Sequence, residues 1–334
     1  MNSFYQEAGA YFFLILFLFA LYAFQRREKV PELAAVVGFG LFWMATKQAY
    51  IPSLGLILAF MLLHYAGRRT SLRLRLLRSV LVFVLVCAGG WGINSWMKVV
   101  DNSPFYCYNV VFTRILPALP DEERPSFLNS IGVPAEFAAA SGTLIYVPGN
   151  SLQDPKLNPL LTGRLQVRAI LHLFQRHPLA GLRLIYDVGH FVGYYEISFL
   201  GYRESKFSIE QQGVGSVSLW TKFRKYYFHG WFSCGISVLL CLGLFLLKPP
   251  ENDGGWFVFY RWGSLVFLLS SLTQIPMVTF GDGNPIPTKQ LYLANLLQDV
   301  ALIFVVSAVC LYFKMRGRSV ENGKSELADS QPSV

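Results

Sequence analysis

Long unbroken runs of apolar residues constrain this chain more than any other feature of its sequence. Seven such runs occur, at about 8–24, 33–46, 51–65, 77–96, 228–247, 259–279 and 290–313. They lack the three-and-four spacing of a water-facing helix, and several approach the roughly 20 residues that cross a bilayer. Since 53% of the 334 residues are hydrophobic and only 15% are charged, a soluble domain could not bury them all. We therefore predict an all-α integral membrane protein with about seven transmembrane helices.

The distribution of these runs divides the chain into four parts. Residues 1–96 hold four candidate spans, residues 97–226 form one large, partly helical polar segment, and residues 227–313 hold three further spans. The polar residues 314–334 are predicted to be a disordered tail. The spans at 33–46 and 51–65 are the shortest and therefore the weakest.

Short basic loops predict how the chain is oriented in the membrane. The sequences QRREK, RRTSLRLRLLR and KMRGR follow the first, third and seventh runs. Because short loops rich in Arg and Lys stay in the cytoplasm, the N-terminus and the segment 97–226 are predicted to lie outside and the C-terminus inside. The first run has no basic residues before it and no small-residue cleavage site after it, so it is interpreted as a span. An outside N-terminus indicates either the later part of a larger architecture or one miscounted span.

The net charge of +9 indicates membrane lipids as partners and not nucleic acid. Most of the basic residues lie beside apolar runs, where positive charge orients the spans against anionic lipid. The five cysteines form no CxxC pair and no Cys/His cluster, so we predict neither a metal site nor a disulfide framework. No P-loop, no GxGxxG at a helix start and no HExxH motif is present. No cofactor is therefore predicted.

Lys47 lies at the outer end of the second run, in the sequence KQAYIP. A lysine at this depth is costly unless it extends to the headgroups or finds an anionic partner. The sequence leaves two interpretations open, a lysine that simply reaches the headgroups and a cation that binds the phosphate of a lipid-linked donor.

A basic amphipathic helix is predicted within the large polar segment, in the sequence LTGRLQVRAILHLFQRHP. Its cations recur at every fourth position and so form one row: Arg164, Arg168, His172 and Arg176. We expect this helix to lie in the membrane interface, with its cations at lipid phosphates and its apolar side toward the acyl chains. In the next stretch, Arg183 and Asp187 are expected to form a pair on one helix face.

Among the acidic residues that are candidates for a role in chemistry, three have informative positions. Asp101 follows the fourth run, in MKVVDNSP, where a lipid-linked leaving group would be presented at the membrane surface. Asp282 lies in a GDG turn before Lys289, which a solvated loop explains equally well. Asp299 falls near the middle of the last run, with Asn295 one turn earlier on the same face. We expect this pair either to join two helices or to line a functional cavity.

The KQAYIP turn, the Arg176-His177-Pro178 helix break and the closing GDG...K...YLANLLQD span together resemble the later part of the polytopic GT-C-type bacterial glycosyltransferases. The resemblance is architectural and covers most of the chain. It implies a multi-pass protein of the bacterial cytoplasmic membrane that transfers a sugar from a polyprenyl-phosphate donor to an envelope glycan or another outer acceptor. Other envelope-glycan assembly proteins would be its partners. Lys47 matches the phosphate-contacting position, and the stretch from Lys289 to Asp299 would help to line the cavity.

The sequence departs from that superfamily in one respect. The catalytic acid usually lies in the first outer loop, but the region before the first span offers only Glu7. Asp101 is then the candidate catalytic carboxylate, and an active protein would be a hexosyltransferase. Two alternatives remain open, a non-catalytic partner or truncated homologue that binds lipid-linked glycan, and a transporter or flippase. The last should show internal repeats, and none is detected.

Overall fold

The computed structural model describes residues 3–27, 30–46, 103–143, 154–193, 223–224, 226–250, 255–281 and 291–329, with a few isolated residues between 55 and 92. Every regular element within these ranges is a helix. This confirms the all-helical part of the predicted fold class for the described chain.

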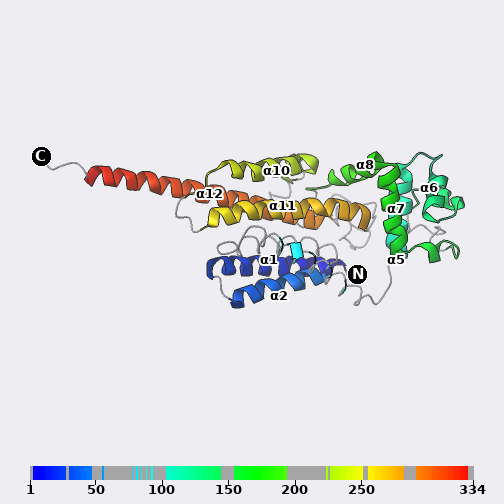
Figure 1. Cartoon of the computed structure of the whole chain (residues 1–334), viewed down its shortest axis with the longest axis horizontal. Coiled ribbons are helices and arrows are strands. Elements are labelled where there is room, and N and C mark those ends of the chain that lie inside the picture. Colours follow the sequence, from blue (N-terminus) through cyan, green and yellow to red (C-terminus); the bar gives the residue numbers. More distant parts are fainter. Residues whose placement is uncertain are drawn as a thin grey trace, which may run out of the picture.

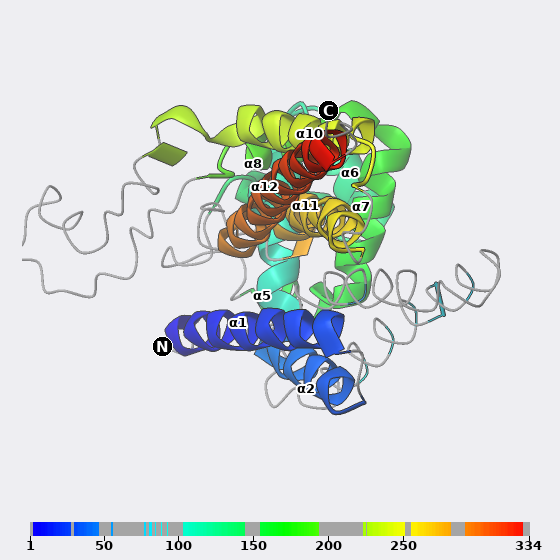
Figure 2. The ribbon, with the colours of Figure 1, turned by 90° about the vertical axis from the view of Figure 1, so that its left-hand side faces the viewer.

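Five long helices run beside one another in a bundle (Figure 1). They are α1 (Ser3–Arg27), α2 (Val30–Thr46), α10 (Gly230–Leu246), α11 (Trp256–Gly281) and α12 (Tyr292–Asp329). Two contain apolar stretches long enough to cross a membrane, Trp256–Gly281 and Leu293–Gly317, while the other three contain shorter apolar helices. Figure 2 shows α1 and α2 on one side of the group formed by α10, α11 and α12.

The other two predicted spans fall mostly outside the described residues. Of 51–65 only Gly55 is described, and of 77–96 only six positions, all helical. The count of seven spans therefore stays a prediction.

The bundle buries one set of apolar side chains and exposes another. Phe17 and Trp43 stack in its core with ring centroids 6.1 Å apart. On the outside, Phe19 is 69% exposed, Phe42 59% and Ile303 62%. Helices that are apolar on all sides suit a bundle surrounded by lipid, because water would oppose such a surface.

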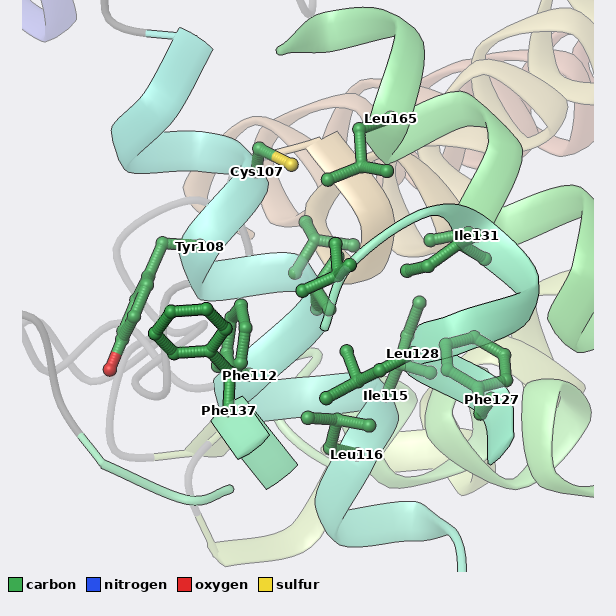
Figure 3. Close-up of a cluster of buried hydrophobic side chains, with 14 of the residues drawn as sticks. Cys107, Tyr108, Phe112, Ile115, Leu116, Phe127, Leu128, Ile131, Phe137 and Leu165 are labelled. Atoms are coloured by element: carbon green, nitrogen blue, oxygen red, sulfur yellow. The ribbon is translucent and has the colours of Figure 1, made fainter. Parts of the chain in front are cut away.

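A second group of helices lies at one end of the bundle (Figure 1). It comprises α5 (Ser103–Tyr108), η3 (Asn109–Ile115), η4 (Leu116–Ala118), α6 (Arg124–Ile131), η5 (Ala135–Ala140), η7 (Asn158–Leu160), α7 (Gly163–Arg176) and α8 (Pro178–Gly189). We call residues 103–143 and 154–193 the helical head. Its side chains form their own hydrophobic core, in which Phe112, Phe127 and Leu165 converge (Figure 3).

Three glycines permit a close contact between the head and the bundle. Gly193 and Gly230 have φ angles of +93° and +57°, which glycine adopts without the strain of a Cβ atom. The Gly230 amide donates to the Val192 carbonyl at 2.5 Å. At Gly189, a Cβ atom would lie 2.2 Å from Cζ2 of Trp231. The end of α8 is thus held directly against the start of α10.

The C-terminal region differs from the sequence-based expectation. Residues 314–334 are predicted to be disordered, but α12 continues as a helix to Asp329 and extends past the other long helices (Figure 1). Extending a helix that is already formed costs far less than nucleating a new one. The preceding span therefore supplies the nucleus for this polar stretch, which contains no proline.

Candidate functional site

The first turns of α12 place three polar side chains on one side of the helix. Asn295, Gln298 and Asp299 are three and four residues apart, the spacing that makes helical neighbours. Asn295 and Gln298 are fully buried, and the Asp299 side chain is 18% exposed. Polar groups buried within an apolar bundle need partners.

Arg224 supplies the main partner. Its side chain has no exposed surface, and its two terminal nitrogens donate to the Asp299 carboxylate and to the Gln298 side-chain oxygen. A longer bond of 3.3 Å reaches the Asn295 carbonyl, and the guanidinium lies 5.6 Å from the Phe228 ring centroid. The cost of burying the arginine charge is thereby offset by a counter-charge and several acceptors.

Further hydrogen bonds connect these residues to α10 and to the head. The Gln298 amide donates to Ser237 Oγ at 2.9 Å and to Ser233 Oγ at 3.4 Å. The Gly193 amide donates to Asn295 Oδ1 at 2.6 Å. We call Arg224, Ser237, Asn295, Gln298 and Asp299 the α12 polar cluster. It joins α10, α12, the residues just before α10 and the end of the head.

The position of Asp299 differs from the sequence-based expectation. The sequence placed it near the middle of a span, but α12 begins at Tyr292 and its apolar stretch runs from Leu293 to Gly317. Asp299 is therefore only about 9 Å along that stretch, at 1.5 Å per residue. The cluster lies at the head end of the bundle and not at the midplane.

Sequence reasoning missed Arg224 and Gln298. One signal pointed to the arginine, because an acid inside a span requires a partner, and TKFRK directly precedes the span of α10. Nothing in the sequence selects Arg224 among its three basic residues, since the choice depends on how α10 packs against α12.

Four predicted site residues, Lys47, Asp101, Asp282 and Lys289, lie outside the described residues. The structure does describe the helix end that precedes Asp282. Gln166 of α7 donates to the carbonyls of Phe280 and Gly281 at 2.7 and 3.3 Å. The basic helix is therefore fixed to the last residues of α11, directly before the GDG turn in the sequence.

Helix α7 has the predicted row of cations but a different environment for its apolar side. Leu165, Ala169 and Leu173 are buried in the head core and so do not face acyl chains, whereas Val167 and Leu171 are exposed. The sequence period shows which side is apolar but not what covers it. Thr162 begins the helix by accepting a hydrogen bond from the Leu165 amide at 3.2 Å, and Pro178 opens α8.

The cations of α7 have different surroundings. Arg164, Arg168 and Arg176 are exposed, whereas the His172 ring lies 5.4 Å from the Phe127 ring. Burial lowers the pKa of His172, and the positive charges of Arg176, His177 and Arg168 lower it further. His172 is therefore neutral at pH 7, so the row carries three permanent charges.

Asp187 interacts with a different arginine from the one expected. Within the described residues no ion pair joins it to Arg183. Asp187 instead lies near Arg114, where burial lowers the pKa of the guanidinium and the Asp187 charge partly opposes that effect.

The Cys107 thiol is buried, and burial raises its pKa to about 12, so it stays protonated and unreactive.

Long apolar helices with lipid-suited exteriors, and a buried ion pair at their junction with a helical head, define a polytopic membrane protein. The chain belongs to the family of the YfdI N-terminal transmembrane domain, which matches residues 1–326. No curated protein and no solved structure matches it significantly.

Proposed function

We propose that this protein is a glycosyltransferase of the bacterial cytoplasmic membrane. It transfers a sugar from a polyprenyl-phosphate-linked donor to an envelope glycan or another acceptor at the outer face, where the head and the N-terminus lie. One observation carries the proposal, the fixing of α7 to the end of α11 directly before Asp282. This contact supports the proposal because it holds a polar helical head against the end of a membrane-spanning helix, where a lipid-linked sugar phosphate would be presented.

The proposed reaction is attack of an acceptor hydroxyl on the anomeric carbon of the donor sugar. The bond between that carbon and the phosphate oxygen breaks, and polyprenyl phosphate leaves with the electron pair. Asp101 takes the proton of the hydroxyl, while Lys47 and Lys289 stabilise the departing phosphate. Asn295 and Asp299 act indirectly, because the α12 polar cluster fixes the helix that begins shortly after Lys289.

Substitution of the proposed chemical groups tests this function. In reconstituted vesicles with a radiolabelled polyprenyl-phosphate sugar, Asp101→Asn and Lys47→Met should each lower transfer about 100-fold or more. Asp121→Asn is the matched control, because Asp121 is an 84% exposed acid of the head that pairs with Arg124. Its transfer rate should equal that of the wild type. Full activity in both test variants, at equal protein levels, would contradict the proposal.

A non-catalytic protein that binds lipid-linked glycan is the second candidate. It is a candidate because Asp299, the acid of the last span, already accepts a hydrogen bond from Arg224, which leaves Asp101 as the one acid proposed to be the general base. The same vesicles distinguish the two functions. Retention of the labelled donor by the wild-type protein, with no transfer to any envelope acceptor, would favour the binding protein.

A further inference from the structure

The helical head leaves a set of apolar side chains uncovered on α7 and α8. Val167 and Leu171 of α7 are 56% and 57% exposed. On α8, Leu179 is 80% exposed, Leu182 55% and Tyr186 54%. Their spacings of three and four residues put them on one face of each helix. We call these five residues the head stripe.

The head stripe of α7 lies between the bundle and the arginines. One flank of α7 contacts the bundle, since the Phe174 ring is 5.6 Å from the Phe280 ring of α11. Turning around the helix by about 100° per residue from Phe174, one meets Val167, Leu171, Arg164, Arg168 and finally His172. His172 contacts Phe127 of α6. The apolar residues therefore lie on the bundle side, and the arginines lie farther from it.

Helix α8 has the same order of groups. Its bundle flank is marked by Ile185, which packs against a cluster that includes Ile275 and Val278 of α11. Tyr186 stacks on Trp231 of α10 at 5.9 Å. Turning in the same sense from Ile185 gives an apolar sector followed by charged residues, in the order Leu182, Tyr186, Leu179, Arg183 and Asp187. Asp187 interacts with Arg114 of the head. Two independent helices thus show apolar groups toward the bundle and an arginine beyond them.

Basic and acidic residues lie in different parts of the head. Helices α7 and α8 contain four arginines and one acid, Arg164, Arg168, Arg176, Arg183 and Asp187. The rest of the head contains more acids than bases, namely Asp121, Glu122, Glu123, Glu136 and Asp154 against Arg114, Arg124 and Lys156. Figure 1 shows α6 at the end of the head far from the bundle, with α7 and α8 between α6 and the bundle. The basic side of the head therefore lies next to the membrane-spanning helices.

We propose that α7 and α8 form a second membrane-binding surface of this protein, specific for anionic phospholipids. The head stripe enters the boundary between headgroups and acyl chains, and Arg164, Arg168 and Arg183 bind lipid phosphates just above it. Such a surface combines apolar burial with attraction to negative lipid. It is independent of the proposed sugar transfer, because the phosphates belong to bilayer lipid and not to the donor.

Depth measurements on the full-length protein in nanodiscs test this surface. The background carries Cys310→Ser, since Cys310 is the exposed cysteine of the described chain. Spin labels are placed at Leu171→Cys and Leu182→Cys, with Ser126→Cys on exposed α6 as the control. In discs rich in phosphatidylglycerol, the first two labels should collide more with oxygen than with a water-soluble nickel complex, and the control should do the reverse.

The lipid specificity has its own comparison. Combining Arg164→Gln, Arg168→Gln and Arg183→Gln should move the labels at 171 and 182 toward water in phosphatidylglycerol discs. With all three arginines present, the same labels should also lie closer to water in phosphatidylcholine discs than in phosphatidylglycerol discs. Equal depth in both lipids, or labels at 171 and 182 as water-exposed as the control, would overturn the proposal. It would also be overturned if the labels moved deeper only when polyprenyl phosphate was added to phosphatidylcholine discs. The arginines would then bind the phosphate of the donor and not that of bilayer lipid.

Discussion

Arg224 is the residue whose surroundings say most about the stability of the bundle. Its charge is fully buried, and Asp299 and Gln298 accept its hydrogen bonds. Removing one partner of a buried ion pair leaves an uncompensated charge, whereas replacing both by apolar groups removes the problem. For this buried pair we therefore expect the single and double substitutions to differ in stability, which we would not expect for a surface ion pair.

Arg224→Met should destabilise the protein by about 3–5 kcal/mol, because it removes one partner of a buried ion pair. The double variant Arg224→Met with Asp299→Leu should recover most of that loss. Thermal unfolding in detergent micelles measures both, with Arg183→Gln as an exposed arginine control. An additive double variant, less stable than either single variant, would argue against a coupled pair.

His172 gives the head a pH-dependent stability. Its pKa in the folded protein lies below the usual 6.5, through burial first and then Arg176, His177 and Arg168. The unfolded chain therefore binds a proton more readily than the folded protein. The stability contributed by neutral His172 is complete above pH 6.5 and is lost as the pH falls from there through the lower folded pKa.

His172→Gln should flatten this loss of stability below pH 6.5. Unfolding followed at several pH values between 7.5 and 5 measures the effect, with the wild type as reference. Arg176→Gln should raise the pKa of His172 toward 6.5, which an NMR titration of the ring detects. An unchanged titration curve would contradict the role of the neighbouring arginines.

At the scale of elements, the contact between α8 and α10 depends on residues without side chains. Trp231 lies over Gly189 and is held there by a hydrogen bond from Nε1 to the Tyr186 carbonyl at 2.8 Å. At Gly193, a Cβ atom would lie 2.7 Å from the His229 Cα, and the φ angle is positive. Neither position has room for a methyl group.

Gly189→Ala and Gly193→Ala should each destabilise the protein by about 1–3 kcal/mol, through overpacking and backbone strain. Gly235→Ala in α10 is the matched control, since a Cβ atom there meets nothing within 4 Å. This control should be neutral or slightly stabilising, because alanine favours a helix. Limited proteolysis between head and bundle, together with the melting temperature, measures the difference. Equal stability in all three variants would show that the head is not fixed through this contact.

The sequence predicts where the helices lie along the chain better than it predicts what each helix packs against. Five of the seven apolar runs correspond to α1, α2, α10, α11 and α12, and Pro178 begins a new helix after α7. Hydrophobic periodicity identified the apolar side of α7 but could not tell a head core from a lipid phase. The partner of Asp299 depended on the packing of α10 against α12, which no local pattern records.

At the scale of the whole molecule, the described helices fix which ends lie together. The end of α11 contacts the head through Gln166, and the start of α11 contacts the last turns of α1 through Trp256 and Tyr22. The N-terminal end of α1 therefore lies at the head end of the bundle, and α12 runs away from it (Figure 1). Arg26, Arg27, Lys314 and Arg316 all lie at the opposite end. From these positions the positive-inside rule predicts that the head lies outside the cell.

Labelling of introduced cysteines tests this orientation. In the Cys310→Ser background, a membrane-impermeant maleimide should label Gln175→Cys in intact cells, because Gln175 is exposed on the head. Lys314→Cys, exposed on α12 at the opposite end, should react only after the cells are opened. Both sites are polar and lie outside the apolar runs, so a difference in reactivity reports sidedness and not burial. If the pattern is reversed, the basic ends face outward, and sugar transfer at the outer face is excluded together with the predicted topology.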